Sequence, residues 1–227
     1  MHNGAETDGD FDPTVYGWRT NGDYGILNSA NLPYPTFYAE KLLQYFARPG
    51  DVVLNATSDN LLLSAYAVQR TNGALTLLVI NKDMTTNLSG EITLTNYVPW
   101  RTATVQSYGI PQDQAAQNHA SASQQDIVTA TYAGAGANFT YDFPPLSLTL
   151  FTFAPGPATL SVSGVQSGQV LLSLQGQAGG TYAVQESSDL ITWTSVTSTA
   201  LPGNISSNSV SLAIGSSSAF YRAVWQP

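Results

Sequence analysis

Apolar runs and apolar/polar alternation dominate the chain from Asp51 onward, and they predict short β-strands separated by turns. In the first part we expect strands near 61–69, 74–81, 90–95, 102–108, 126–132, 137–143 and 146–153. After Ala154-Pro155-Gly156-Pro157, a stiff break, we expect strands near 158–163, 169–175, 180–186, 191–197, 208–214 and 219–225. This spacing is typical of sandwiches. We therefore predict an all-β protein of two tandem antiparallel β-sandwiches, residues 51–154 and a smaller one at 158–227.

Arg70-Thr71-Asn72-Gly73 carries the strongest local signal. Asn-Gly between two apolar runs predicts a tight hairpin in which both turn residues adopt positive φ. The flanking runs are apolar on both faces, whereas an antiparallel sheet usually leaves one face in water. Another element must therefore cover the outer face of this hairpin.

Residues 34–47 form the one clear helix pattern, and we expect this helix to be that cover. Pro33 and Pro35 suit its first turn, and Arg48-Pro49-Gly50 ends it. Its wide apolar face contains Phe37, Tyr38, Leu42, Tyr45 and Phe46. Residues 1–31 keep neither the strand nor the helix period, so residues 1–50 are predicted to be an irregular lead-in followed by this single N-terminal helix.

The amino-acid composition argues against several classes of protein. Only 10% of the 227 residues are charged, the net charge is −8, and the pI is about 4.3, which argues against a nucleic-acid partner. No apolar run reaches the roughly 18 residues of a membrane span, and no N-terminal stretch has signal-peptide character. Without cysteine, the chain has no disulfide or thiolate metal site. Such a composition is typical of extracellular bacterial β proteins, so we expect a secreted protein.

Two segments before residue 50 resemble the last barrel helix of clan A glycoside hydrolases and its lead-in: Asn21–Leu27 and Phe37–Leu43. The enzymes in question are family 44-type endoglucanases and α-L-arabinofuranosidase-like hydrolases. Leu61–Ala67, Leu75–Lys82 and Phe143–Leu150 resemble the β-sandwich that follows the barrel in those enzymes. The resemblance covers about residues 20–154. It implies an accessory region beside a catalytic barrel whose carboxylates lie upstream, so that no catalytic residue of the family maps onto this chain.

Residues 158–227 resemble small C-terminal modules of secreted bacterial enzymes. The resemblance is carried by Tyr182–Trp193 and by Phe220-Tyr221-Arg222-Ala223-Val224. It implies no activity for this part of the chain.

Catalytic carboxylates of glycosidases come in pairs. Glu40, Glu91 and Glu186 are the candidates, and we expect structural roles for all three. The two histidines, His2 and His119, give no support for a nucleophile triad.

Asp8, Asp10 and Asp12 have the 1, 3, 5 spacing of a calcium loop, in which alternate side chains point into one cavity. The EF-hand pattern then fails, because Pro13 and Arg19 occupy the positions of its glycine and glutamate. A solvated acidic loop is favoured, calcium is the alternative, and no other cofactor is expected.

Two aromatic groups are candidates for contact with carbohydrate, because sugar rings stack on flat aromatic faces. One is Trp100, which follows Pro99 in a turn-like segment, together with Tyr97; the other joins Trp18 to Tyr16 and Tyr24. Packing against a neighbouring domain is the alternative for both groups. Trp193 and Trp225 alternate with other apolar residues in predicted strands and are expected to pack in the core or between domains.

These observations leave two main hypotheses. The first is a non-catalytic accessory region of a secreted hydrolase that degrades plant polysaccharides, with the catalytic barrel as its partner. The second is a pair of carbohydrate-binding modules that recognises cell-wall glucan or xylan. An independent hydrolase is a third and weaker hypothesis.

Overall fold

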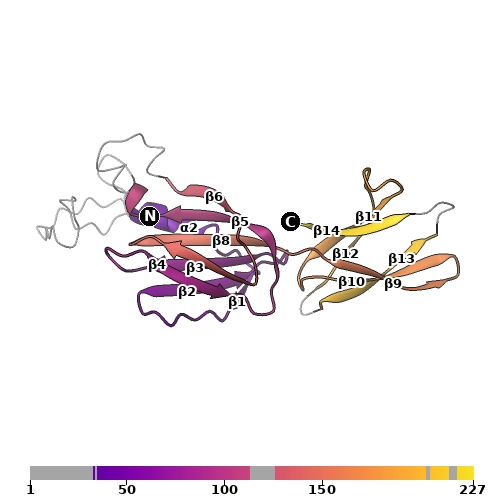
Figure 1. Cartoon of the computed structure of the whole chain (residues 1–227), viewed down its shortest axis with the longest axis horizontal. Coiled ribbons are helices and arrows are strands. Elements are labelled where there is room, and N and C mark those ends of the chain that lie inside the picture. Colours follow the sequence, from indigo (N-terminus) through magenta and orange to yellow (C-terminus); the bar gives the residue numbers. More distant parts are fainter. Residues whose placement is uncertain (1–32, 34, 113–125, 203–204, 215–218) are drawn as a thin grey trace, which may run out of the picture.

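The computed structural model describes residues 33, 35–112, 126–202, 205–214 and 219–227. They form two β lobes that lie end to end (Figure 1). All paired strands of both lobes are antiparallel, which confirms the predicted β class. None of the helices in these ranges has the length and apolar character to cross a bilayer.

The elements with both ends in the described part of the first lobe are α2 (Pro35–Leu43), β1 (Val52–Leu54), β2 (Leu63–Gln69), β3 (Leu75–Asn81), β4 (Leu88–Thr93), β5 (Pro99–Tyr108), β6 (Val128–Tyr132), β7 (Asn138–Phe143) and β8 (Ser147–Pro155). Residues 110–112, after β5, are also helical. Six strands make one sheet in the order β1-β2-β3-β8-β5-β6, and β4 pairs with β7 in a second, two-stranded sheet.

An aromatic core separates these two sheets. Phe151 and Phe153 of β8 stack with ring centroids 5.6 Å apart, and Phe139 and Phe143 of β7 meet them from the other sheet. Successive residues of a strand point to opposite faces, so β8 also presents Leu148 and Leu150 to its outer face. The sheet therefore needs cover on both sides.

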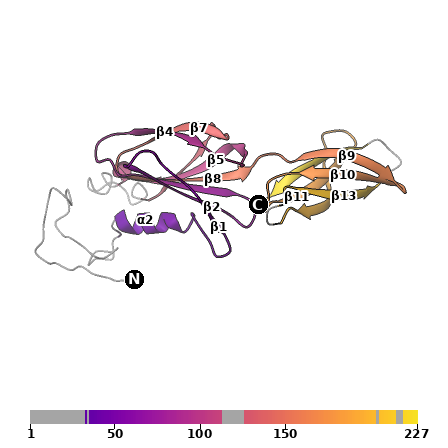
Figure 2. The same ribbon diagram turned by 90° about the horizontal axis from the view of Figure 1, so that it is seen from below.

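Helix α2 covers the outer face, which confirms the sequence-based expectation. Figure 2 shows α2 on one side of the six-stranded sheet and β4–β7 on the other. Tyr38 stacks on Tyr108 of β5 at 5.0 Å, and Leu42 lies buried against Leu78 and Leu150. The apolar face of this helix is thus inside the chain itself.

The helix ends at Leu43, four residues earlier than predicted. Tyr45 and Phe46 instead continue in tighter turns, in which their N–H groups donate to the carbonyls three residues back. Side chains of the sheet satisfy the carbonyls that follow: Arg70 donates to Tyr45 O, and Thr76 Oγ1 donates to Phe46 O at 2.7 Å. Tertiary hydrogen bonds therefore replace the last helical turn.

The hairpin between β2 and β3 forms as predicted, but its turn differs. Arg70 N donates to Ala74 O and Gly73 N donates to Arg70 O, which makes a three-residue loop. Of the central residues only Gly73 has positive φ (+86°), whereas Asn72 was also expected there. The Asn72 side chain accepts a hydrogen bond from Ala74 N at 3.1 Å instead. Asn72 thus stabilises the turn as an acceptor.

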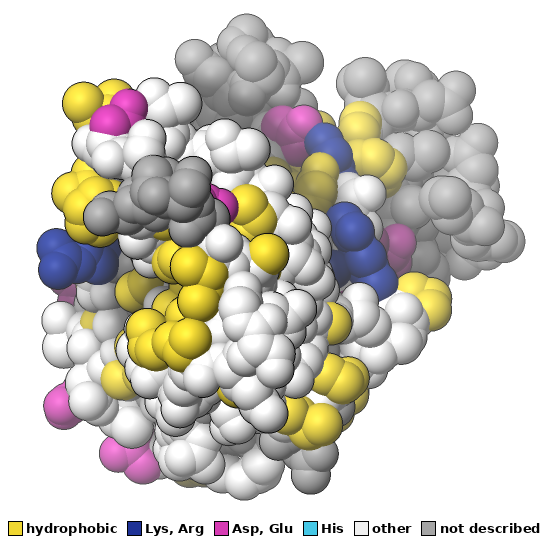
Figure 3. Space-filling model, turned by 90° about the vertical axis from the view of Figure 1, so that its right-hand side faces the viewer, with side chains coloured by type: hydrophobic (Ala, Val, Ile, Leu, Met, Phe, Trp, Pro, Cys, Tyr) yellow, Lys and Arg dark blue, Asp and Glu magenta, His cyan; other side chains and the backbone are white. Residues whose placement is uncertain are grey.

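The second lobe contains six strands in two three-stranded sheets. They are β9 (Thr159–Gln166), β10 (Gln169–Gln175), β11 (Thr181–Ser187), β12 (Thr194–Ala200), β13 (Ser207–Ala213) and β14 (Phe220–Gln226). The sheet orders are β13-β10-β9 and β12-β11-β14. A buried cluster with members from both sheets includes Leu172, Leu174, Tyr182 and Val184. Seen from its end in Figure 3, this lobe has a mostly uncharged surface with apolar patches.

β12 begins at Thr194, three residues later than predicted. The carboxylate of Asp189 accepts hydrogen bonds from Ile191 N and Thr192 N and closes a turn there. Ile191 is consequently exposed, and Trp193 precedes the strand. The expected core alternation of these two side chains is wrong.

The lobes touch through the turn between β2 and β3. Gln69 Nε2 donates to Ala178 O, and Trp225 Nε1 donates to Asn72 O, both at 2.9 Å. Gly73 approaches the backbone of Gly180 so closely that a Cβ at Gly73 would lie 2.8 Å from Gly180 N. The second lobe is therefore docked on the first through backbone groups as well as linked by the chain.

Candidate functional site

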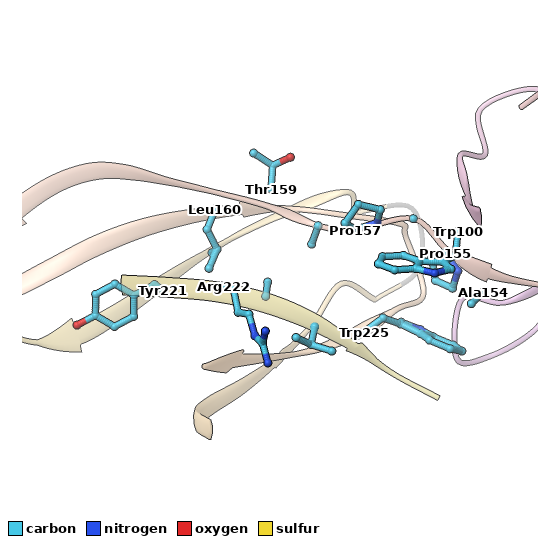
Figure 4. A pocket seen from close by; sticks show the side chains of 13 residues that line it. Trp100, Ala154, Pro155, Pro157, Thr159, Leu160, Tyr221, Arg222 and Trp225 are labelled. Carbon is cyan, nitrogen blue, oxygen red and sulfur yellow. The ribbon is translucent and has the colours of Figure 1, made fainter. Parts of the chain in front are cut away.

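A groove of about 750 Å³ lies where the two lobes meet. Its walls come from Trp100 of β5, the connection at 154–160, and residues 221–225 of β14. Figure 4 shows the indole rings of Trp100 and Trp225 near one end of the groove and Tyr221 near the other. Two aromatic side chains far apart in sequence thus share one hollow.

Trp100 is held outward by an irregularity in β5. Pro99 pairs with Pro155, and the register against β8 then shifts before Ala103. Such a bulge turns side chains away from the regular alternation. The ring is 49% exposed, as the sequence predicted, and its indole N–H has no partner among the described residues. Trp100 therefore offers a half-exposed indole to the groove.

The side chain of Trp225 is held in place by both lobes. Its Nε1 donates to Asn72 O of the first lobe, and its ring packs beside the core of the second lobe. The sequence predicted this packing but not its place in a groove. The alternation along β14 predicts that Trp225 faces inward. The local sequence does not show that this residue also borders a groove beside the other lobe.

The groove carries little charge. Of the described residues that line it, Arg222 is the one with a charge. Its Nε donates to Gln185 Oε1 at 2.8 Å, and its guanidinium carbon lies 4.1 Å from the ring centroid of Trp193. Since neighbouring strand residues point to opposite faces, Arg222 also projects away from Tyr221 and Ala223. The groove is chemically suited to an uncharged ligand.

Tyr97 does not join Trp100. It is buried in the first lobe, where its hydroxyl donates to Phe153 O at 3.0 Å, and burial raises the pKa of that hydroxyl. Tyr97 is only 6% exposed and does not line the groove, so it gives Trp100 no second stacking ring, which corrects the prediction for this residue. Its role is to join the segment before β5 to the core.

The other predicted site residues lie outside the described ranges: Trp18, Tyr16 and Tyr24 of the aromatic group, and Asp8, Asp10 and Asp12 of the calcium motif. Within the described ranges, no three His, Asp or Glu side chains come together to hold a metal ion.

A second hollow of about 950 Å³ opens on the inner face of β2 and β3. Its far wall is β4, and residues 54–60 close one side. Asp59 and Glu91 both contribute to its lining, and both are exposed to solvent. A glycosidase acid works from desolvated surroundings, which neither residue has. Of the other candidate acids, Glu40 is exposed on α2 and Glu186 lies half-buried within β11.

Three carboxyl groups of the described residues have a lowered pKa, and each is a hydrogen-bond acceptor. Backbone N–H groups of Thr85 and Thr86 lower the pKa of Asp83, and those of Thr192 and Ile191 lower the pKa of Asp189. For Asp126, partial burial acts upward, but the hydrogen bonds from Lys41 Nζ (2.6 and 2.7 Å) and from Ile127 N leave its pKa lowered. These groups stabilise turns and tie α2 to the sheet.

Comparison with known proteins gives partial likenesses only. No protein-family model matches the chain, and no curated protein does. Among solved structures it is similar to a GH30 endoxylanase from Clostridium papyrosolvens C71 (18% identity, TM-score 0.43, 56% of this chain and 30% of that one). It is also similar to CelM2, a bifunctional glucanase-xylanase from a metagenome library (27% identity, TM-score 0.44, 54% and 23%). A third is a Paenibacillus polymyxa xyloglucanase of glycoside hydrolase family 44 (21% identity, TM-score 0.36, 45% and 18%). The chain spans less than a third of each of these structures.

Proposed function

We propose that this chain is a non-catalytic accessory region of a secreted bacterial glycoside hydrolase that degrades plant polysaccharides, and that it supports the catalytic barrel. The observation that carries the proposal is α2, a single helix that completes an aromatic cluster on the outer face of the six-stranded sheet. In sequence this helix resembles the last barrel helix of clan A enzymes, and the strands after it resemble their sandwich. In this proposal both lobes are β-sandwiches.

Among the described residues, nothing covers the outer face of the sheet beside α2. Val53 lies opposite Val68, and Tyr66 lies opposite Leu78, so both point to the side on which the helix packs. They are 79% and 50% exposed. Exposed apolar side chains gathered on one face are typical of a contact surface. We assign this β1–β2 surface, Val53 with Tyr66, to the barrel.

A hydrolysis assay tests the accessory role. The purified chain is expected to release no reducing sugar from xyloglucan, arabinoxylan or mixed-linkage β-glucan. Release that disappears in Glu91→Gln or Asp59→Asn would show a catalytic pair in the second hollow and overturn the proposal. Glu40→Gln is the matched control, because Glu40 is also exposed but lies far from that hollow in the fold.

The contact surface has its own test. The chain should bind an apolar dye such as ANS, and Val53→Ser with Tyr66→Ser should lower the dye fluorescence without lowering the melting temperature, because neither side chain is buried. Val165→Ser, on an exposed site of β9, is the control and should have a smaller effect. Equal effects would mean that the β1–β2 surface is not special.

The second hypothesis, carbohydrate binding, gains a specific observation from the exposed ring of Trp100 in the groove between the lobes. An accessory region that also holds the polysaccharide would keep the enzyme near its substrate.

A further inference from the structure

We infer that the groove between the lobes is a binding site for an uncharged polysaccharide chain, and that the ring of Trp100 is its main platform. This inference goes beyond the accessory role and does not depend on it. A glycan bound here would be held whether or not a barrel contacts the β1–β2 surface.

The rings and prolines of the groove give it the right surface chemistry. Pyranose rings expose flat C–H faces, which pack on aromatic rings and on other rigid apolar groups. Trp100 is half-exposed and lines the groove, and Pro155 and Pro157 continue the apolar wall beside it. The indole N–H of Trp100 forms no hydrogen bond with the described residues, so a sugar hydroxyl can accept from it.

The charge distribution selects the class of glycan. The described lining contains no carboxylate and no lysine, and its one cation, Arg222, is already bonded to Gln185 and stacked on Trp193. An acidic polymer would gain no free cation, while a neutral chain would have no buried charge to desolvate. Neutral glucan and xylan chains fit this lining better than uronate-rich polymers.

The shape of the groove favours a chain over a single sugar. It follows β14 from Tyr221 to Trp225, which is about 13 Å at the rise of a β-strand. The hydrogen bond to Asn72 O sets the position of the Trp225 ring before a ligand arrives. An extended groove with an aromatic platform at one end suits several consecutive sugar rings.

The test is affinity electrophoresis of the full chain in gels that contain xyloglucan, mixed-linkage β-glucan or arabinoxylan, followed by calorimetry with cellohexaose and xylohexaose. We expect retardation by at least one of these neutral polysaccharides and a tryptophan fluorescence change with the matching hexasaccharide. Trp100→Ala should weaken binding at least about tenfold, or about 1.4 kcal/mol. Trp100→Phe, which keeps a flat ring, should retain most of the affinity.

Tyr66→Ala is the matched control, because Tyr66 has nearly the same exposure as Trp100 (50% and 49%) but lies on the β1–β2 surface. It should leave glycan affinity unchanged. The inference fails if no neutral polysaccharide retards the wild-type chain, or if Trp100→Ala, with an unchanged melting temperature, binds as well as the wild type. It also fails if binding is confined to polygalacturonate and disappears at high salt, which would indicate a charge-driven site. None of these outcomes bears on the hydrolysis assay, so the two proposals are tested separately.

Discussion

At the scale of single residues, Gly73 has two separate reasons to be glycine. Its φ of +86° is costly for any residue with a Cβ, and a Cβ would also lie within 3 Å of Gly180 N and Cα. Gly73→Ala should therefore lower the free energy of unfolding by about 2 kcal/mol or more, which urea denaturation would measure.

The variant Gly168→Ala separates the cost of the positive φ from the cost of the close approach to Gly180. Gly168 also has positive φ (+74°), but nothing lies within 4 Å of the Cβ it would gain. This variant should lose only the backbone part, about 1–2 kcal/mol. If both variants lost the same free energy, the close approach of Gly73 to the second lobe would contribute nothing.

Tyr97 gives a prediction that depends on pH. Burial raises its pKa in the folded state above the unfolded value of about 10. The folded state thus favours the protonated phenol, so the stability from Tyr97 is fully present below pH 10 and is lost as pH rises above it. Tyr97→Phe should cost about 1 kcal/mol at pH 7, through loss of the hydrogen bond to Phe153 O. The difference should close above pH 10, and a constant difference would contradict this reading.

At the scale of elements, α2 is stabilised by the sheet below it. Leu42 is fully buried in the cluster with Tyr38, Tyr108 and Leu150, whereas the next residue, Leu43, is 45% exposed. Leu42→Ala should cost about 3 kcal/mol because it leaves a cavity. Leu43→Ala should cost well under 1 kcal/mol, and chemical denaturation measures both. Equal losses would mean that α2 does not pack on the sheet in solution.

Sequence patterns located these elements well where the pattern is local. The period of two placed β10 at its observed bounds, and the two-faced apolar character of the Leu75–Asn81 strand correctly called for a covering helix. The two boundary errors have different causes. Arg70 and Thr76 are far from the helix in sequence and end it early through tertiary hydrogen bonds, which no window of neighbouring residues contains. The late start of β12 comes from the local turn that the Asp189 carboxylate closes, a signal that the apolar alternation of Ile191 and Trp193 outweighed in the prediction.

The sequence predicted one part of the candidate site, the exposure of Trp100, but not the roles of Trp225 and Tyr97. The exposure of Trp100 follows from its place beside Pro99, a position poorly suited to a core. The part played by Trp225 requires the second lobe to stand next to the first, and Tyr97, only three residues from Trp100, is buried by the fold of the whole lobe. The pattern of a single strand does not show which residues of the other lobe will lie beside it, so a groove built by two lobes cannot be predicted from it.

At the scale of the whole molecule, the two lobes are held by few contacts. Apart from the connecting chain, the hydrogen bonds of Gln69 and Trp225 and the approach of Gly73 to Gly180 join them. Small interfaces between domains usually permit relative motion. The double variant Gln69→Ala with Trp225→Phe should therefore broaden the distance distribution in small-angle X-ray scattering.

A matched variant keeps this experiment interpretable. Gln185→Ala also removes a surface amide of the second lobe, but one that bonds within the lobe to Arg222. Its scattering profile should equal that of the wild type. Should the double variant also match the wild type, the orientation of the lobes would be set by the connecting segment alone.

The last strand, β14, runs toward the junction, so Pro227 lies close to the first lobe (Figure 1). Whatever is joined to that end, whether a purification tag, a fluorophore or a reporter protein, begins within a few residues of Trp225. A label placed there would obstruct the hollow between the lobes and distort any titration with sugars. The loop between β9 and β10 at Ser167–Gly168, at the opposite end of the second lobe, is the better point of attachment.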